Sequence, residues 1–421
     1  MTSAPPARRL ALEVRVHGEL VGLLHRDREG QTAFSPDAAW LARNQRPPLG
    51  LSFLAHPGPR RAGTGLPPWF DNLLPEVGSA LRGRICRQLG LRESDSPALL
   101  RALGHDLPGA VEVAGDAEKD EGAPPEPVPE GQLRFSLAGM QLKLSMLRTD
   151  DRFALPARGQ TGRWIVKIAG DRFPELPEVE DATMAWANRA GLAVARHQVL
   201  PVESLIGLDR NLIGSNEHVL AVERFDRKAD GSRVHQEDFA QALEIGPSHK
   251  YGDSGPRRTS YDLLARLVRD ASGPAAQGEF IDRLAFVVAS GNGDAHLKNW
   301  SFQWGLEHRP WLTPCYDLVA TISWPDVDGW QLPDGPRLAL ALGRSRRLAD
   351  LDRERVSRFA ERAEAADGQA RFLSALERAR AAWGLLADAV PQRMREAVVE
   401  HWQRVPLLRF VGLAPRGAAT H

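Results

Sequence analysis

Three polar residues in the second half of the chain have types and spacing that could do chemistry. Asp294 precedes Asn299 by five positions, and Asp317 follows after a short apolar, strand-like run. Phosphoryl transfer from Mg-ATP needs such a set. One carboxylate takes the proton of the acceptor hydroxyl, while an amide oxygen and a second carboxylate hold Mg²⁺. A polar, glycine-rich turn after a helix is the alternative explanation of the same stretch.

The loop between the first two of these residues carries further polar groups. His296 and Lys298 stand inside it, and we expect both side chains to contribute to nucleotide binding. The spacing of the whole set is similar to that of a protein-kinase catalytic loop and its metal aspartate. The letters differ from the common His-Arg-Asp and Asp-Phe-Gly forms.

A lysine within an apolar run is the second feature that this chemistry would use. Lys167 lies in Trp164–Ile168, where a charge is costly unless it has a partner, and kinases place such a lysine against the phosphates of the nucleotide. Residues 178–190 predict a helix that a glycine ends. Glu180 on this helix is the predicted partner of the lysine, with Glu178 as a rival. The alternatives are an edge-strand lysine that points into water and glutamates that merely suit the positive end of a helix.

Two more segments flank the lysine strand. In the loop before it, the small residues Ser136, Ala138 and Gly139 would let backbone amides approach phosphate oxygens. After it, Glu223 and Phe225 end the β-rich part of the chain, where a nucleotide base needs backbone hydrogen bonds and an apolar face. A charged strand end between two lobes is the alternative explanation of this second segment.

The order of these features along the chain predicts an α+β, bilobal fold like that of protein kinases. We expect an extra N-terminal module, a β-rich N-terminal lobe that holds nucleotide, and an all-helical C-terminal lobe that holds acceptor and metal. The predicted boundaries are residues 10–112 for the β-rich module, 113–131 for an acidic, proline-rich linker, 132–230 for the nucleotide lobe and 231–421 for the helical lobe.

Local patterns add detail to this division. The alternation in Leu10–Val16 and Leu20–Leu24 predicts a β-hairpin. From His235 onward the apolar spacing is helical. Within residues 348–405 the helical pattern is interrupted at two positions, Gly368 and Pro391.

Composition limits the classes of function. The chain has 421 residues, of which 43% are hydrophobic and 26% charged, as in globular proteins of two or three units. Lys and Arg number 54, as do Asp and Glu, so no global field favours nucleic acid or an anionic membrane. Cys86 and Cys315 lie far apart, which fits a reducing cytoplasm. No apolar run has the length of a membrane span, and we expect a cytoplasmic protein.

Taken together, these motifs resemble the HipA-like serine/threonine kinases of bacterial toxin–antitoxin systems. The resemblance extends over nearly the whole chain, including the first module, and it is most specific in the Asp-x-His-x-Lys-Asn string with its downstream Tyr-Asp. The matching segments are Phe70–Glu76, Gly104–Ala110, Ser136–Lys143, Trp164–Lys167, Ala221–Arg227, His235–Gln241, Ser248–Tyr251, Asn292–Asn299 and Leu312–Asp317.

The resemblance implies a role for each matching residue, with ATP and Mg²⁺ as cofactors. Asp294 would be the catalytic aspartate. Asn299 and Asp317 would hold Mg²⁺, and Lys167, supported by Glu180, would contact the ATP phosphates. The residues implied at the adenine are Glu223 and Phe225.

Regulation and partners are implied in the same way. Ser136 would be the loop serine that members of this family autophosphorylate, which ejects the loop and silences the kinase. The implied targets are aminoacyl-tRNA synthetases, chiefly the glutamyl enzyme, whose phosphorylation halts translation and produces growth arrest or persistence. A small helix-turn-helix antitoxin similar to HipB would neutralise the toxin, and DNA would be contacted only through that antitoxin.

Two other functions fit the same residues. A small-molecule kinase on the same frame would share the Asp/Asn/Asp set, so only a substrate test separates it from a protein kinase. A catalytically silent corepressor would hold an antitoxin on DNA. Loss of the lysine, the catalytic aspartate or the metal ligands would favour that last function, yet all of them are present.

Overall fold

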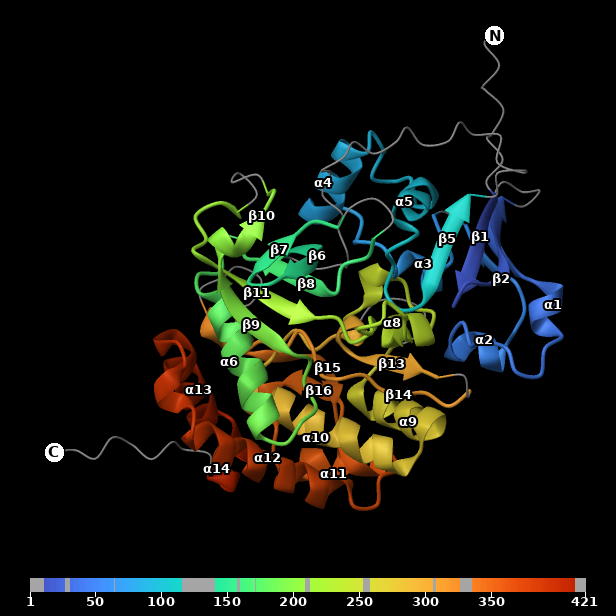
Figure 1. The fold of residues 1–421 in the computed structure, drawn as a ribbon. Helices are drawn as coiled ribbons and strands as arrows, with labels where there is room; N and C mark the ends of the chain where they lie inside the picture. The colour runs from blue at the N-terminus through green and yellow to red at the C-terminus, as the bar shows by residue number, and fades with distance from the viewer. Residues whose placement is uncertain are drawn as a thin grey trace, which may run out of the picture.

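The computed structural model describes residues 11–26, 31–63, 65–115, 141–156, 160–170, 172–208, 213–252, 258–305, 308–325 and 335–412. The predicted bilobal arrangement is confirmed, with a separate N-terminal module packed against the β-rich lobe (Figure 1). Among the described residues, no helix combines the length and apolar character needed to cross a membrane.

The N-terminal module is an antiparallel five-stranded sheet with short helices around it. Its strand order is β4-β3-β2-β1-β5. The predicted hairpin is confirmed, because His17 and Gly18 both have left-handed φ angles (52° and 78°) that suit a two-residue turn between β1 and β2. The elements are β1 Ala11–Val16, β2 Glu19–Arg26, β3 Thr32–Pro36, α1 Ala38–Leu41, α2 Leu51–Ala55, β4 Arg60–Ala62, α3 Pro68–Asp71, α4 Ala80–Gln88, α5 Ser96–Leu103 and β5 Val111–Gly115.

The nucleotide lobe is a six-stranded sheet of order β10-β7-β6-β8-β11-β9, covered on one face by helix α6. Neighbouring residues of β11 point to opposite faces: Val219 packs into a core shared with the N-terminal module, and Leu220 into the core that includes α6. The elements are β6 Leu142–Thr149, β7 Arg152–Ala154, β8 Trp164–Ile168, α6 Leu176–Arg189, β9 His197–Pro201, β10 Leu205–Ile206 and β11 His218–Glu223.

The C-terminal lobe packs its helices around the long, buried helix α10. The predicted interruptions are confirmed, because α12 begins at Gly368 and α13 begins directly after Pro391. Trp186 of α6 joins Trp383 and Trp402 in one aromatic cluster, with ring centroids 4.7–5.7 Å apart, so the two lobes share a core. The helices are α8 Phe239–Ala242, α9 Tyr261–Ser272, α10 Pro274–Ser290, α11 Arg353–Arg362, α12 Gly368–Gly384, α13 Gln392–Arg404 and α14 Pro406–Val411.

The prediction that this lobe is wholly helical is wrong. A three-stranded antiparallel sheet joins β12 (His235–Asp238), β13 (Ser301–Trp304) and β14 (Trp311–Leu312), and β15 (Arg337–Leu342) pairs with β16 (Ser345–Arg347). The residues at the start of the helical half form strand β12, whose last residue Asp238 then caps α8. Its pairing partner comes more than sixty positions later, which no local pattern can indicate.

Candidate active site

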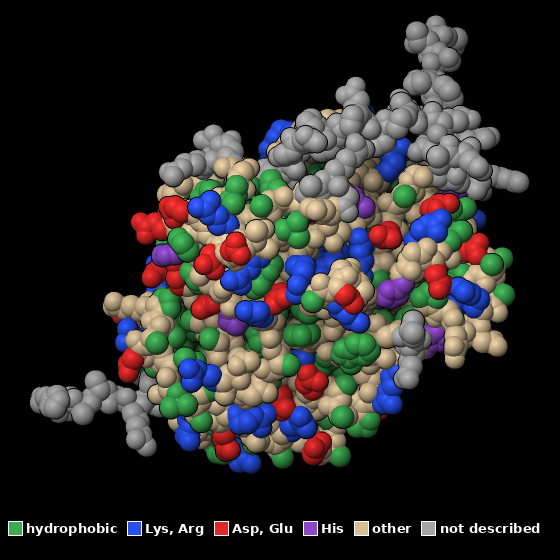
Figure 2. Space-filling view, in the orientation of Figure 1, with side chains coloured by type: hydrophobic (Ala, Val, Ile, Leu, Met, Phe, Trp, Pro, Cys, Tyr) green, Lys and Arg blue, Asp and Glu red, His purple; other side chains and the backbone are tan. Residues whose placement is uncertain are grey.

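An open cleft lies where the two lobes and the N-terminal module meet. Among the described residues it includes a first cavity of about 950 Å³ and a second of about 720 Å³, each including space open to solvent. Lysine and arginine side chains gather across the middle of this face, between the β-rich part and the helices (Figure 2). Both cavities are lined by Lys143, Lys167, Lys250, His296, Asn299 and Asp317, so they adjoin.

Strand β8 carries Lys167 into the cleft. The lysine is only 5% exposed, which excludes an edge-strand lysine that points into water. Its ammonium donates to the carboxylates of both Glu180 and Asp317. Glu178 lies elsewhere on α6 and contacts His218 at 2.8 Å, because residues two positions apart face different sides of a helix. The glutamate beside the lysine is therefore Glu180.

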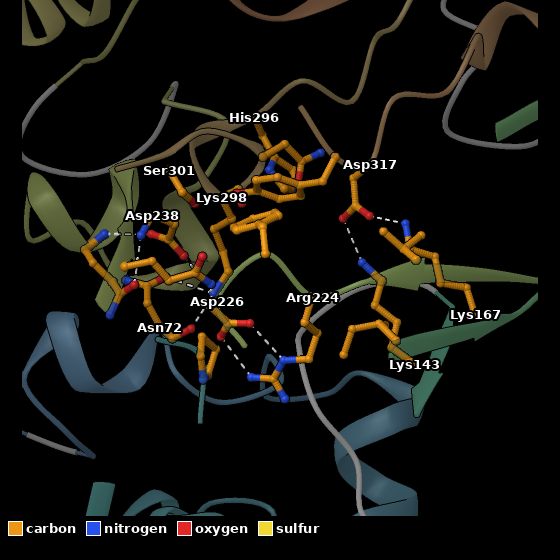
Figure 3. A pocket seen from close by; sticks show the side chains of 18 of the residues that line it. Asn72, Lys143, Lys167, Arg224, Asp226, Asp238, His296, Lys298, Ser301 and Asp317 are labelled. Atoms are coloured by element: carbon orange, nitrogen blue, oxygen red, sulfur yellow. Dashed lines mark hydrogen bonds and ion pairs between the residues drawn. The ribbon is translucent and has the colours of Figure 1, made fainter. Parts of the chain in front are cut away.

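Four charged side chains form what we call the cleft cluster: Lys143, Lys167 and Glu180, which are buried, and Asp317, which is 21% exposed. Figure 3 shows both lysines reaching toward Asp317, and Lys143 Nζ donates to its Oδ2 at 2.7 Å. Burial disfavours the charge on Lys167, but the two carboxylates outweigh it and raise its pKa. Burial also works against a charge on Asp317, yet the lysines hold the pKa of that carboxyl far below its usual range. For Glu180, burial dominates and raises the pKa.

The chain before Asp317 is fixed to both lobes. Cys315 exchanges backbone hydrogen bonds with Ala193 and Ala195 of the nucleotide lobe (2.8 and 2.9 Å). The hydroxyl of Tyr316 lies 2.5 Å from that of Ser301 in the C-terminal lobe. Asp317 itself has a left-handed φ of 52°, a conformation that is uncommon for a non-glycine residue, although aspartate adopts it more often than most.

The loop that we predicted to be catalytic begins where α10 ends. Gly291 has a φ of 63°, and a Cβ atom there would lie within 2.7 Å of Ile322, so the turn requires glycine. Asn292 Oδ1 accepts from the backbone N–H of Asp294 at 2.9 Å. Asn299 Nδ2 donates to the backbone oxygen of Asp294 at 2.8 Å. These bonds set the distance between the predicted base and the predicted metal ligand.

The carboxylate of Asp294 lines the second cavity. Its Oδ1 accepts a hydrogen bond from the hydroxyl of Tyr251 at 2.7 Å, and His296 Nε2 lies 3.9 Å from the same oxygen. Burial lowers the pKa of His296 to about 4, so this imidazole is neutral at pH 7. Burial and the nearby Asp294 carboxylate raise the pKa of Tyr251, so its hydroxyl keeps its proton as a donor.

The first cavity carries the apolar surface expected for a nucleotide base. Ile165 and Val222 line it, and the rings of Phe225 and Tyr316 meet there with centroids 5.6 Å apart. Glu223 lines the same cavity, and its carboxylate is paired with two arginines, 2.7 Å from Arg163 and 3.6 Å from Arg196. Because this carboxylate is engaged, we expect contact with a base to come from the backbone of Glu223.

Lys298 lies at the first cavity but not at the second. Its Nζ donates to the backbone oxygen of Asn72 at 2.7 Å and lies 3.7 Å from Asp238. It therefore joins the N-terminal module to strand β12 rather than facing Asp294. Ser136, Ala138 and Gly139, which we predicted to approach the phosphates, lie outside the described residues.

The residues expected to bind Mg²⁺ offer hard oxygen donors in a suitable position. The side-chain nitrogen of Asn299 donates to the loop backbone, so the amide oxygen of the same side chain points away from that hydrogen bond. Asn299 and Asp317 both line the two cavities. In the described part of the chain no three His, Cys, Asp or Glu side chains form a metal cluster by themselves. Two protein ligands completed by phosphates and water are the usual arrangement for Mg²⁺.

Comparisons with known proteins agree with this geometry. Residues 12–114 match the model of the HipA N-terminal domain, and residues 135–402 match that of the HipA-like C-terminal domain. The chain belongs to the HipA family.

Two relatives and one solved structure give the extent of the similarity. A Sinorhizobium fredii protein named "Putative kinase Y4dM" is 35% identical over 94% of this chain and 98% of its own length. The serine/threonine-protein kinase toxin HipA of Shewanella oneidensis is 28% identical over 61% of this chain and 63% of its own. A structure of the Shewanella oneidensis HipA toxin–antitoxin system with HipB and operator DNA has a TM-score of 0.65 at 22% identity, covering 95% of this chain and 94% of that one.

Directly after strand β11, where the chain passes between the two lobes (the hinge), this HipA-family chain has a second set of buried charges. We call it the hinge cluster: Asp106, Arg224, Asp226 and Arg227. Arg224 binds Asp226 through two nitrogens, both at 2.9 Å, and Asp106 at 2.8 Å. Asp226 also accepts from the backbone N–H of Gly109 at 2.7 Å. The two arginines outweigh burial and lower the pKa of Asp226 to about 2. The cluster therefore joins the residues directly after β11 to residues 106–109 of the N-terminal module.

Sequence reasoning missed several residues of the site. Lys143 carries the same signal as the lysine of β8, a charge inside an apolar strand, and could have been found. Tyr251 belongs to a segment that carries the family resemblance, but its contact with Asp294, 43 positions away, could not be predicted. Asn72 and Glu76 belong to the N-terminal module, and nothing local indicated that they reach the cleft.

Proposed function

We propose that this chain is an ATP-dependent serine/threonine protein kinase. The observation that carries the proposal is the arrangement of Asp294, Asn299 and Asp317 around one cleft, together with the buried pair of Lys167 and Glu180. Mg-ATP would supply the phosphoryl group and neutralise part of its charge. The rest of the chemistry falls to the side chains of the cleft.

Asp294 serves as the group that takes the proton of the acceptor hydroxyl. Tyr251 and His296 both approach its Oδ1, so its Oδ2 is left for the acceptor. Since His296 is neutral, it does not cancel the negative charge that the base needs. The second cavity beside this carboxylate is open and large enough for a serine or threonine side chain.

The two lysines of the cleft cluster serve the phosphates. Lys143 and Lys167 both donate to Asp317, the carboxylate assigned to Mg²⁺. Binding of the metal at that carboxylate would release their donors toward phosphate oxygens, while Glu180 keeps Lys167 in place. A lysine is suited to this exchange because its ammonium is a compact charge on a flexible stem.

The finer parts of the proposal rest on family membership. The substrate is an aminoacyl-tRNA synthetase, with the glutamyl enzyme first to be tested. Ser136 is the autophosphorylation site, where about −1.5 to −2 charges would be added to a loop that approaches ATP phosphates. The HipA neighbour from Shewanella oneidensis was solved with HipB and operator DNA, which supports a HipB-like antitoxin as the partner here. We place the protein in the cytoplasm.

Intact-mass analysis after incubation with Mg-ATP tests this function. We expect the chain, and glutamyl-tRNA synthetase added to it, each to gain the mass of a phosphoryl group, with peptide mapping placing the group on the chain at Ser136. ATP consumption without phosphorylation of any protein would favour a small-molecule kinase. The absence of any ATP consumption would favour the silent corepressor.

A further inference from the structure

Lys250 occupies a position in the cleft that the proposed mechanism has not used. It is one of the six described residues that line both cavities, and its side chain is 13% exposed. Its Nζ lies 2.7 Å from Glu76 Oε1, in the N-terminal module, and 5.4 Å from the ring centroid of Tyr251. Its backbone oxygen accepts from the N–H of Leu297, so it is attached directly to the catalytic loop.

The other lysines of the cleft are committed elsewhere. Lys143 and Lys167 bind the carboxylates of the cleft cluster. Lys298 lines only the first cavity, and its ammonium is held by Asn72 and Asp238. Lys250 is therefore the lysine that borders the cavity of Asp294 without a partner in the cleft cluster.

We propose that Lys250 binds the terminal phosphate of the nucleotide, and that Glu76 is the counter-ion from which it is exchanged. This inference rests on the proposed kinase function. In the structure the Glu76 carboxylate, which also lines the first cavity, holds the ammonium. When a phosphate with several negative charges enters, Lys250 turns its donors to that phosphate, and Glu76, 26% exposed, turns toward water.

This exchange gives the N-terminal module a direct part in nucleotide binding. Glu76 competes with the terminal phosphate for one ammonium, so the module weakens binding of a triphosphate more than that of a diphosphate. The site consequently distinguishes ATP from ADP through a residue outside the two kinase lobes.

Binding of two nucleotides to the full chain tests the proposal without any turnover. Calorimetry with Mg²⁺ would measure the affinities for the non-hydrolysable analogue AMP-PNP and for ADP. In Lys250→Met we expect the ratio of AMP-PNP to ADP affinity to fall about 10- to 100-fold, the value of one charge-assisted hydrogen bond, with ADP affinity nearly unchanged. Lys250→Arg should keep most of the ratio. Lys228→Met, a change at an exposed lysine, is the matched control and should leave it unchanged.

Glu76→Gln decides whether exchange occurs. We expect the ratio of AMP-PNP to ADP affinity to rise in this variant, because residue 76 no longer carries the negative charge that competes with the phosphate. A ratio that falls in this variant would show that Glu76 holds the lysine in place, and would overturn the exchange. An unchanged ratio in Lys250→Met, with a wild-type unfolding temperature, would overturn the phosphate contact. Failure of the wild-type chain to bind either nucleotide would instead overturn the kinase function on which the inference rests.

Discussion

The hinge cluster and the cleft cluster each combine two basic with two acidic side chains, but they differ in their partners and in their exposure. In the hinge cluster the cations are Arg224 and Arg227, with side chains 3% and 1% exposed, and backbone groups of the N-terminal module bind several of the remaining donors and acceptors. In the cleft cluster the cations are lysines. Asp317, which both of them bind, is 21% exposed toward the cavities.

The difference shows how one fold separates fixed charges from exchangeable ones. A guanidinium binds through a rigid planar fork, so arginines that bind two carboxylates through several nitrogens hold one geometry. An ammonium is a point charge that can change partners at little geometric cost. We infer that the hinge cluster stabilises the contact between module and hinge, whereas the cleft cluster is arranged to be reorganised by a ligand.

Breaking the hinge cluster should have the largest effect on stability. Asp226→Asn leaves two buried guanidinium groups with one carboxylate, and we expect the free energy of unfolding to fall by about 3–5 kcal/mol. Urea unfolding would measure it, with Asp317→Asn as the matched change in the cleft cluster. A larger loss for Asp317→Asn would contradict the division of roles, because that side chain is partly solvated.

Breaking the cleft cluster should instead lower the rate of ATP turnover. Asp317→Ala deletes a predicted Mg²⁺ ligand, so we expect magnesium-dependent ATP turnover to fall at least about 10²-fold. Turnover would be followed as Mg²⁺ is titrated. If the variant turned over ATP at the normal rate with a normal dependence on magnesium, the metal assignment would be ruled out.

A smaller effect is expected from the hydrogen bond that positions the base. Tyr251→Phe removes the donor to Asp294, and we expect kcat to fall roughly tenfold, or about 1.4 kcal/mol, with KM for ATP unchanged. Tyr261→Phe is the control, since that hydroxyl donates to the backbone oxygen of Ala295 and does not contact the carboxylate. Equal loss of kcat in both variants would assign Tyr251 a structural role only.

A dependence of stability on pH is expected from a carboxyl group that belongs to neither cluster. Glu237, buried between the C-terminal lobe and the module, accepts from Trp69 Nε1 at 3.0 Å, and burial raises its pKa to about 8. Between its ordinary value of 4.5 and about 8, the folded protein keeps a proton that the unfolded chain loses. The free energy of unfolding should therefore fall as pH rises through this range, by at most about 1.4 kcal/mol per pH unit.

Glu237→Gln isolates this contribution from that of the buried histidines. Burial lowers the pKa of His235 to about 4, so this residue makes stability rise between about pH 4 and 6.5 in wild type and variant alike. Urea unfolding at several pH values should show wild type losing stability relative to the variant between pH 6.5 and 8. A constant difference across that range would show that the carboxyl is already ionised.

The parts of the site that could be predicted from sequence are those with a local signal. Lys167 stood out as a charge within an apolar strand, and Glu180 lay on a helix with clear propensity. Asp294 and Asn299 lie in one loop, so their spacing can be seen in the sequence itself. All of these residues line at least one of the two cavities of the cleft.

What escaped prediction depends on contacts between distant segments. Glu76 and Lys250 are 174 positions apart. The sheet of β12, β13 and β14 arises because four polar-looking residues from His235 find a partner after α10, and no periodicity in the strand itself shows this. Glu178 and Glu180 have the same helix propensity, so the sequence could not show which of them faces Lys167. That choice depends on how the helix packs against the sheet.

The measurement that tests the central claim most directly is phosphotransfer by Asp294→Asn. The variant keeps the shape of the side chain and removes the base. We expect phosphoryl transfer from Mg-ATP, followed by intact mass over time, to fall by roughly 10²–10⁴-fold, while calorimetry shows that the nucleotide still binds. Transfer at a rate near that of the wild-type protein would show that Asp294 is not the base, and the account of this cleft as a kinase active site would be wrong.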